Sequence, residues 1–377
     1  MSSKIKKKGI YKAHYLTACR LDNWVRLLCE NKFKISKEKI PQLLYMLGAS
    51  ILLTPFTLLE SLIYAAPIRR HKMKKDPVFI IGHWRSGTTY LQNLLSKDKQ
   101  FGWCDPVSTT TFCNSYLLGP LMGKIQSGVL GEARPMDNME YKLDLPMEDV
   151  FALNLISTHS IIHLIAFPQN FEHYLKESFI DELPEKSQKE WEKATRYVLN
   201  KMSLRNKGKQ LMLKSPDHTC HVEKLMEMYP DAKYVNIHRD PYVTIMSTIN
   251  MFKKQMELIQ LNEEPDDLEI LLEDAIVELF RHIYSKLFAL LDSGAFKEGS
   301  IVDVPYDELS AKPEETLKRI YDELELDGFE EALPYFREHI ASVNSYVKNK
   351  FELKPRLRDK INDKLGFYFE RYSYEWR

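Results

Sequence analysis

A short segment around residue 85 combines the side chains that hold a phosphate-like anion. In VFIIGHWRSGTTYLQNLL, an apolar run ends at a glycine and soon leads into Arg85, Ser86, Gly87, Thr88 and Thr89. Gly82 and Gly87 have the spacing of GxxxxGK[ST], the loop whose backbone N–H groups wrap a phosphate at a helix N-terminus. Thr88 replaces the lysine that a nucleoside triphosphatase places on its terminal phosphates, and the cation lies inside the loop as Arg85. The segment therefore predicts a site for a terminal anionic group that needs no metal.

A second segment, KYVNIHRDPYVTIMS, predicts another anion site where a strand ends. Arg239 closes the apolar run, Asp240 can cap the helix that follows, and Pro241 suits the first position of that helix. Ser247 follows near the second turn, so a guanidinium that folds back and this hydroxyl can bind one phosphate together. The structural alternative is a salt bridge between Arg239 and Asp240.

Together, the two segments resemble the nucleotide-binding segments of the sulfotransferase superfamily. The likeness runs from about Asp76 to the C-terminus and includes PYDEL at 305–309. It implies a P-loop-like α/β fold with a parallel sheet, and 3′-phosphoadenosine 5′-phosphosulfate (PAPS) as the sulfuryl donor. The first segment would hold the 5′-phosphosulfate and the second the 3′-phosphate. Arginine in the loop, in place of the lysine of the cytosolic steroid and phenol branch, is similar to the bacterial and tyrosylprotein branches.

A third segment, LMLKSPDHTCH (211–221), carries residues to which the resemblance assigns catalytic roles. Lys214 matches the family's strand-end lysine, whose fixed ammonium stabilises the charge that grows on the leaving phosphate. The cytosolic branch holds its catalytic histidine two residues after that lysine, whereas His218 lies four residues after Lys214. We expect His218 to be the general base. Its alternative role is that of a helix-start residue that binds backbone.

Several other residues are candidates for the same site. Glu148 and Asp149 precede an apolar run and could supply the base, although paired acids also complement a helix dipole. The tyrosylprotein branch uses a glutamate downstream of its loop arginine, and Asp105 is the nearest acid here. Lys350, in NSYVKNKFELKP, has the position of the family's late basic loop over the nucleotide, or belongs to an exposed basic turn.

No metal is expected in the reaction, because Arg85 and Lys214 supply the positive charge that magnesium supplies to kinases. His159 and His163 have the i, i+4 spacing of metal ligands. They lie, however, in the apolar stretch LISTHSIIHLIAF with no third ligand evident, which favours a role in the core or in a pocket.

Charge and cysteine content narrow the partners and the compartment. Lys+Arg and Asp+Glu both number 53, so no global field favours nucleic acid, and the anion site must be local. The five cysteines lack CxxC or CxH spacing, which is typical of a reducing compartment and of neither a disulfide framework nor a zinc site. The basic N-terminus lacks the apolar core of a signal peptide. These features predict a cytoplasmic location.

The elements that must position these residues alternate between short apolar runs and amphipathic helices. This alternation predicts a three-layer α/β fold with a central parallel sheet flanked by helices. The expected strands are 77–82, 210–215, 233–238 and 300–304. Helices are expected from Thr88, from Asp217, from Pro241, from Lys312 and over 265–292. Residues 105–208 show no strand pattern and are expected to form helices and loops over the sheet.

Residues 1–75 are predicted to form a helical segment ahead of a sulfotransferase domain over 76–377. The run from Leu43 to Leu59 carries no charge, and basic residues flank the apolar stretch on both sides. One alternative is a buried helical hairpin broken at Pro55. A second is peripheral contact with the inner face of a membrane through residues 40–75. A membrane span is the third.

The function that these patterns favour is sulfuryl transfer to a small hydrophobic alcohol. The acceptor pocket is expected from residues 1–75 and 105–208, whose Leu, Ile, Phe, Met and Tyr content favours a sterol, a lipid or an aromatic alcohol. A P-loop kinase or other phosphotransferase is one alternative, which Thr88 in the lysine position disfavours. The other is a nucleotide-binding protein without catalysis, which would be expected to lack Lys214 or the loop hydroxyls. The sequence leaves the oligomeric state open.

Overall fold

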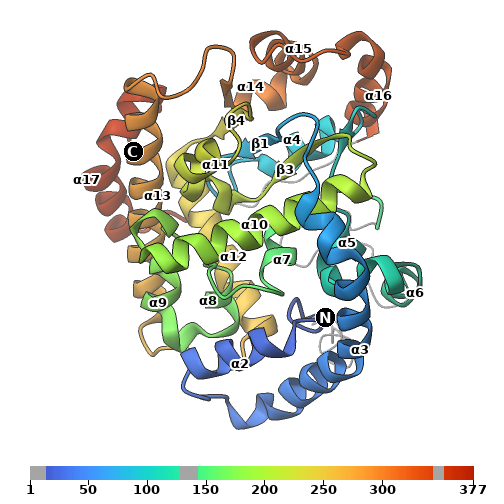
Figure 1. Cartoon of the computed structure of the whole chain (residues 1–377). Helices are drawn as coiled ribbons and strands as arrows, with labels where there is room; N and C mark the ends of the chain where they lie inside the picture. The colour runs from blue at the N-terminus through green and yellow to red at the C-terminus, as the bar shows by residue number, and fades with distance from the viewer. Residues whose placement is uncertain (1–13, 128–142, 343–351) are drawn as a thin grey trace. The chain divides into compact units, whose positions relative to one another are not determined.

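The computed structural model describes residues 14–127, 143–342 and 352–377 (Figure 1). The chain divides into two compact units, each assembled from several stretches. The first comprises Met1–Met73, Trp103–Gly208 and Lys253–Pro265, and the second comprises Lys74–Gly102, Lys209–Phe252 and Asp266–Arg377. The boundary at residue 73 lies close to the predicted division after residue 75, but the N-terminal helices share their unit with two later stretches. The assignment of residues 1–75 and 76–377 to separate domains stays a prediction.

The second unit is built on a sheet of five parallel strands in the order β2-β3-β1-β4-β5. The strands are β1 (Val78–Ile81), β2 (Phe101–Gly102), β3 (Gln210–Lys214), β4 (Lys233–His238) and β5 (Ile301–Pro305). β1 lies at the centre, where Ile80 is in register with Lys214 on one side and with Val235 on the other. The four predicted strands are confirmed. β2 has only two residues, which is too short for the apolar pattern that predicts a strand.

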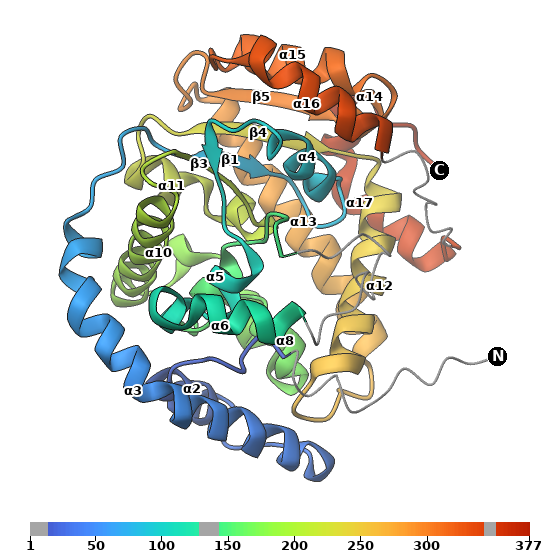
Figure 2. The ribbon, with the colours of Figure 1, turned by 90° about the vertical axis from the view of Figure 1, so that its right-hand side faces the viewer.

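Helices cover both faces of this sheet (Figure 2). They are α4 (Thr88–Leu95), η6 (Pro216–His221), α11 (Val222–Met228), α13 (Leu268–Asp292), α14 (Tyr306–Ala311), α15 (Pro313–Glu323), α16 (Phe329–Ser342) and α17 (Pro355–Tyr372). Val78 and Ile80 belong to the core shared with α4, α15 and α16. Because strand side chains alternate, Phe79 points to the other face, where it contacts His218 of η6. The predicted three-layer α/β fold is confirmed.

The first unit is helical in its described part, as predicted for residues 1–75 and 105–208. Its α-helices are α2 (Leu21–Glu30), α3 (Ile40–Arg70), α5 (Pro106–Thr110), α6 (Ser115–Ser127), α7 (Val150–Leu153), α8 (His163–Ala166), α9 (Phe171–Lys176) and α10 (Glu185–Arg205). Short 3-10 turns are η2 (Lys37–Lys39), η3 (Phe112–Asn114), η4 (Pro168–Asn170) and η5 (Ile180–Glu182). The helix α12 (Pro241–Ile259) starts in the second unit and ends in the first.

The apolar N-terminal stretch forms one long helix, α3, so the predicted hairpin with a break at Pro55 is wrong. Pro55 and Pro67 both lie inside the helix. A proline removes one backbone hydrogen bond, but the hydroxyl of Thr54 donates to the carbonyl of Ser50 at 2.8 Å and supports the same turn. By length and composition, α3 could cross a membrane. Only 17% of its most apolar 18-residue stretch is buried inside the protein, so most of that stretch is exposed.

Candidate active site

The loop between β1 and α4 can only be built with glycine at two positions. Gly82 has φ +136°, and a Cβ there would lie 2.3 Å from the carbonyl oxygen of Ile237 on β4. Gly87 has φ +112°, and its Cβ would lie 2.3 Å from Cδ2 of Tyr306. The loop is thus pressed against the end of the neighbouring strand. Gly87 is the N-cap of α4 and no side chain caps this helix, so the amides of its first turn remain for an anion.

Side chains from three other elements hold the backbone of this loop. The Thr219 hydroxyl accepts from the N–H of Gly82 at 2.8 Å and donates to its carbonyl at 3.1 Å. Thr248 of α12 donates to the carbonyl of Trp84 at 3.0 Å. The N–H of His83 donates to the Tyr284 hydroxyl at 3.3 Å. These contacts tie the backbone of the loop to η6, α12 and α13.

The side chain of Arg85 reaches the second predicted segment. Its Nε donates to Oγ of Ser247 at 3.0 Å, a contact between residues 162 positions apart in the chain. Arg85 itself has φ +68°, a conformation that costs a non-glycine residue energy and is typical of functional loops. Beside it, the hydroxyl of Ser86 is fully buried and has no hydrogen-bond partner among the residues that the structure describes. A buried hydroxyl without a partner fits an anion that supplies the missing acceptor.

Arg239 completes the junction between the two segments. Its Nη1 donates to the carbonyl oxygen of Arg85 at 3.4 Å, and its guanidinium stacks on the Tyr306 ring at 4.1 Å. The hydroxyl of Tyr368 donates to the Arg239 carbonyl at 3.1 Å. Asp240 caps the next helix through the N–H of Val243 and pairs with Arg377 at 2.5 Å. Asp240 thus has the predicted capping role.

Lys214 approaches the loop from the neighbouring strand β3. The side chain is buried, with 2% of its surface exposed, and Nζ donates to Oγ1 of Thr89 at 3.2 Å. The two residues lie at the carboxyl end of β3 and in the first turn of α4. A buried ammonium at this position has lost its hydration and interacts strongly with any anion bound there.

His218 lies in the same unit, on η6 directly after β3. It is buried, and its ring meets the Phe79 ring edge-on at a centroid distance of 5.0 Å. The backbone N–H of His218 donates to the backbone carbonyl of Ser215 at 2.9 Å. The predicted position at a helix start is confirmed. Its role as the base stays a prediction.

The acidic candidates belong to the first unit. Glu148 is half-buried just before α7, and the buried Asp149 occupies the N-cap of that helix. Asp105 caps α5 in a reciprocal capping box with Ser108 and also accepts from Nε of Arg205 at 3.1 Å. Its carboxylate therefore already has structural partners, which disfavours a role as the base.

Eight of the predicted donor-site residues come together in the second unit, and they are Arg85, Ser86, Gly87, Thr88, Thr89, Lys214, Arg239 and Ser247. Lys350 lies outside the described residues. Sequence reasoning missed Tyr306, Thr219 and Tyr368, which position the loop and Arg239. Tyr306 is the tyrosine of the PYDEL segment, so that motif contained a signal for it.

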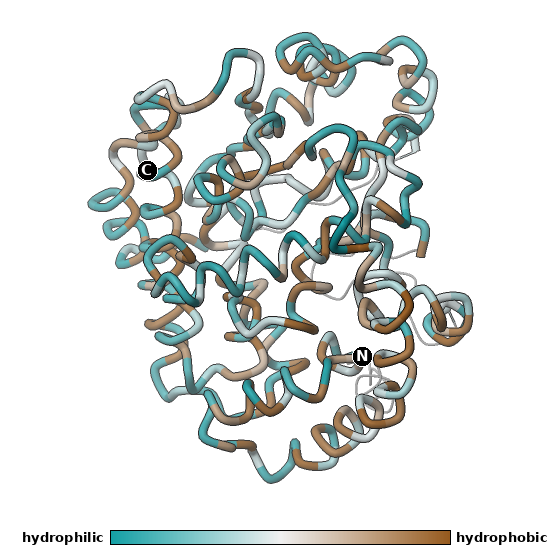
Figure 3. Tube along the Cα trace, viewed as in Figure 1, coloured by the Kyte–Doolittle hydropathy of each residue, from teal (hydrophilic) through white to brown (hydrophobic). Residues whose placement is uncertain are grey.

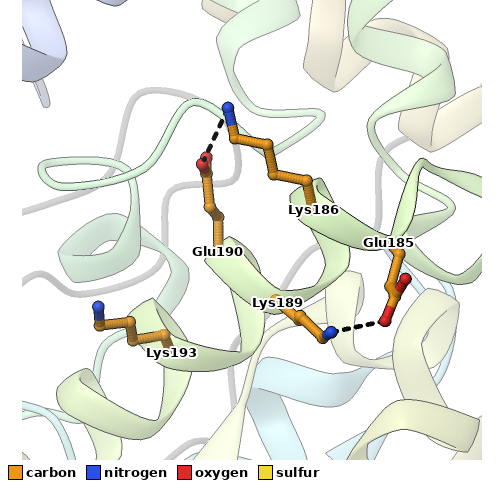
Figure 4. Close-up of a pocket in the computed structure, with 5 residues that line it drawn as sticks. All are labelled: Glu185, Lys186, Lys189, Glu190 and Lys193. Atoms are coloured by element: carbon orange, nitrogen blue, oxygen red, sulfur yellow. Dashed lines mark hydrogen bonds and ion pairs between the residues drawn. The ribbon is translucent and has the colours of Figure 1, made fainter.

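A charged surface on α10 consists mainly of residues that pair with one another. The exposed face of α10 has a depression lined by Glu185, Lys186, Lys189, Glu190 and Lys193 (Figure 4). Two i, i+4 ion pairs, of 2.5 Å and 4.0 Å, join four of these residues. Water screens exposed pairs of this kind, so they contribute little to stability, and we assign this surface no ligand.

His159 and His163 have separate structural partners in the first unit. Burial opposes protonation of His159, but the contact with Glu177 at 2.6 Å outweighs it and raises the pKa of the imidazole. His163 is buried, bonds the Tyr15 hydroxyl and the Ser157 carbonyl, and burial lowers its pKa to about 4. No group of three potential metal ligands occurs among the residues that the structure describes.

Comparison with known proteins agrees with this geometry. Residues 77–331 match the model of a sulfotransferase family. The sequence is 27% identical to the omega-hydroxy-beta-dihydromenaquinone-9 sulfotransferase Stf3 of Mycobacterium bovis and, to the same extent, to that of Mycobacterium tuberculosis. The alignment covers 99% of this chain and 95% of each relative.

Solved structures share the fold at lower identity. Sulfotransferase STF9 from Mycobacterium avium superposes with a TM-score of 0.66 at 19% identity, over 87% of this chain and 86% of that one. Sulfotransferase STF1 from Mycobacterium tuberculosis gives a TM-score of 0.62 at 17% identity, over 91% of each chain.

Proposed function

The chain belongs to the sulfotransferase family, and from this we propose that it transfers a sulfuryl group from PAPS to the hydroxyl of a lipid alcohol. The observation that carries the proposal is the meeting of the two anion-binding segments. Arg85 contacts Ser247 at 3.0 Å and accepts from Arg239 at 3.4 Å, although each partner lies more than 150 residues away in the chain. The kinase alternative is disfavoured by family membership and by Thr88 in place of the phosphate-binding lysine.

The loop is proposed to hold the 5′-phosphosulfate of the donor. Arg85 and the hydroxyls of Ser86, Thr88 and Thr89 supply hydrogen-bond donors. Gly87 at the N-cap has no side chain, which leaves the backbone amides of the first turn of α4 accessible. The buried, unpartnered Ser86 hydroxyl supports this fit. Arg239 and Ser247 are proposed to hold the 3′-phosphate. Ser247 accepts from Arg85, so its own O–H can still donate to a phosphate oxygen.

Lys214 is proposed to act on the bridging oxygen between sulfur and the 5′-phosphate. During transfer, the acceptor oxygen bonds to sulfur while the bond from sulfur to that bridging oxygen breaks, and adenosine 3′,5′-bisphosphate leaves. The buried ammonium next to Thr89 stabilises the charge that develops on the leaving oxygen. With Arg85 it supplies the positive charge that kinases obtain from magnesium, so we propose a reaction without metal.

His218 is proposed to be the base that takes the proton of the acceptor hydroxyl, with Glu148 as the competing candidate. His218 lies four residues after Lys214 and belongs to the same unit. We expect His218→Ala to remove most of kcat, to abolish the acidic limb of the pH–rate profile and to leave product-nucleotide affinity nearly intact. An active His218→Ala enzyme together with an inactive Glu148→Gln enzyme would instead assign the base to Glu148.

The proposed acceptor is a lipid alcohol with a long apolar part. Support comes from the similar Stf3 proteins, whose name specifies an ω-hydroxylated dihydromenaquinone, and from the exposed apolar side chains of α3 in the first unit. We also propose a cytoplasmic location, because all five cysteines are free thiols.

The proposal is tested by incubating the full chain with PAPS labelled in its sulfate group and with separate acceptors. The panel comprises an ω-hydroxylated isoprenoid quinone, a sterol, a phenol, a sugar and a tyrosine peptide. We expect label on the isoprenoid alcohol, with activity unchanged by EDTA. Transfer to the sugar or peptide alone would overturn the acceptor class, and transfer of the γ-phosphate of ATP would overturn the reaction.

A further inference from the structure

The helix α3 presents its apolar side chains to solvent. Leu52 and Leu62 are 75% and 83% exposed, and neighbouring apolar side chains are exposed as well. These neighbours are Ile40, Leu44, Tyr45, Ile51, Phe56, Leu58, Leu59 and Ile63. Figure 3 shows apolar residues along much of the helix. Exposed apolar surface that continues over several turns is unusual in a soluble protein and marks a docking surface.

Three polar side chains of α3, those of Gln42, Ser50 and Glu60, are instead buried in the first unit. Glu60 is buried, forms an ion pair with Lys201 of α10, and accepts from the N–H groups of Tyr116 and Leu117 at 2.9 Å and 3.0 Å. Ser50 is buried and accepts from Nε1 of Trp24 at 3.1 Å. An ordinary amphipathic helix buries its apolar side and exposes its polar side. The orientation of α3 is inverted.

Charge on this helix favours an anionic surface. Glu60 is the only charged residue between Ile40 and Ile68, and it is buried against its lysine. The exposed side of that stretch therefore carries no charge. Exposed basic residues follow at the C-terminal end, namely Arg69, Arg70 and Lys72. A parallel pairing of two copies of this face would bring the like charges of these ends together, whereas anionic headgroups complement them.

We propose that the exposed face of α3 docks the protein on a bilayer that contains anionic phospholipid, with the helix lying flat in the headgroup region. Basic groups near anionic headgroups and apolar side chains below them are the features of an interfacial helix. Leu121 and Ile125 of α6, which packs against α3, are also exposed and can extend the surface.

The helix lies on the membrane and does not cross it. Its buried side chains recur from Gln42 through Met46, Ser50 and Glu60 to Ile68, so the first unit holds α3 over most of its length. At about 1.5 Å per residue, that contact is roughly 39 Å long, which exceeds the hydrocarbon thickness of a bilayer. A spanning orientation would require these polar contacts to break. Docking itself does not depend on catalysis, but the purpose we give it, access to a lipid acceptor, rests on the proposed function.

Vesicle flotation with the full chain tests the proposal. We expect the protein to float with phosphatidylcholine vesicles that contain phosphatidylglycerol. Combined Leu52→Gln, Leu58→Gln and Leu62→Gln changes should weaken binding about tenfold or more, because each leucine loses its transfer into the apolar region. The control for the single Leu62→Gln change is Ile270→Gln on α13, where the side chain is also exposed and apolar. The Ile270→Gln protein should float like wild type.

The basic end of α3 is tested separately. Arg69→Glu and Arg70→Glu should each weaken binding to phosphatidylglycerol vesicles about fivefold or more, since a basic residue near the surface contributes about 1 kcal/mol. The same variants should bind pure phosphatidylcholine vesicles like wild type. Because all substituted side chains are exposed, their melting temperatures and affinities for adenosine 3′,5′-bisphosphate should match wild type, which excludes misfolding as the cause of lost flotation.

Three results would overturn docking. The first is wild-type protein that stays at the bottom of the gradient at low salt. The second is a dimer that does not float and that the leucine substitutions convert to monomer. The third is vesicle-bound protein that resists extraction with alkaline carbonate and therefore spans the bilayer. Transfer to a detergent-dispersed alcohol is measured in parallel. Flotation without transfer removes the proposed function and leaves docking, whereas transfer without flotation removes docking alone.

Discussion

At the scale of single residues, the site depends on cations held by contacts with other parts of the chain. Arg85 keeps its strained backbone, with φ +68°, while its carbonyl accepts from Arg239 and its side chain donates to Ser247. Tyr306 fixes the Arg239 guanidinium from the other side at 4.1 Å. Both guanidinium groups are thus oriented by contacts within the protein, which reduces the entropy lost on binding.

Arg239→Ala is expected to weaken the binding of adenosine 3′,5′-bisphosphate by about 2–4 kcal/mol, because a buried phosphate would lose its charged partner. The affinity for adenosine 5′-phosphate, which lacks the 3′-phosphate, should fall much less. Calorimetry with both nucleotides measures the difference. Arg337→Ala removes an exposed ion pair with Glu314 and should leave both affinities unchanged. An equal loss for the two nucleotides in Arg239→Ala would contradict the assignment of the 3′-phosphate.

Lys214→Ala is expected to lower kcat far more than it raises the KM for the donor, since its contact with the bridging oxygen strengthens in the transition state. Steady-state kinetics with varied PAPS measures both quantities. Lys233→Ala is the control, because that lysine bonds the Gly299 carbonyl at the start of β4. A change in KM with an unaltered kcat would show that Lys214 only binds the ground state.

At the scale of elements, the turn from β1 into α4 decides whether the donor can approach the backbone. Glycine is required where the loop meets β4 and Tyr306, and glycine is not required in the exposed helix α3. No atom lies within 4 Å of a Cβ built at Gly48, in contrast to the 2.3 Å contact at Gly87. The two positions form a matched pair for one substitution.

Gly87→Ala is expected to destabilise the fold by about 1–3 kcal/mol, because alanine would have φ +112° and clash with Tyr306. The same change should reduce affinity for adenosine 3′,5′-bisphosphate. Gly48→Ala in the interior of α3 should instead stabilise the protein by about 0.5–1 kcal/mol. Denaturant titration and calorimetry measure these effects. A Gly87→Ala protein with wild-type stability and affinity would refute the tight turn as the basis of donor binding.

At the scale of the whole molecule, buried histidines in both units make stability depend on pH. Burial lowers the pKa of His14, His83 and His163 to about 4 and that of His238 to about 3. The unfolded chain binds protons at these residues near pH 6.5, whereas the folded chain does not. Their contribution to stability is complete above pH 6.5 and is lost as the pH falls toward 4. His173 has the opposite sign, because its contact with Glu30 raises its pKa.

Stability is therefore expected to fall as the pH is lowered from 6.5 to 4. His238→Gln should reduce the loss of unfolding free energy at pH 4 by on the order of 3 kcal/mol. One proton bound only in the unfolded chain contributes about 1.4 kcal/mol for each pH unit below 6.5. His173→Gln should change the slope only above pH 6.5, where the folded protein holds that proton and the unfolded chain does not. Denaturant titrations from pH 4 to 8 measure both slopes. An unchanged slope in His238→Gln would mean that His238 is protonated in the folded state.

The sequence by itself determined the parts of this protein that depend on neighbouring residues. The apolar runs predicted four of the five strands, because burial of a strand on both faces leaves a continuous local pattern. The residues from Arg85 to Thr89 and from Arg239 to Ser247 predicted two anion sites, since each is a local combination of charge, hydroxyls and turn residues.

Only the tertiary structure decided how those parts meet. It placed Ser247 at Arg85 and Tyr306 at Arg239, contacts between distant segments that no local pattern encodes. It also decided the form of residues 40–70, which the apolar pattern left open between hairpin, surface helix and span. Burial of Glu60 with Lys201 holds α3 against the first unit as one helix and turns its apolar side outward. Composition alone cannot predict this orientation, because it depends on a partner more than 100 residues away.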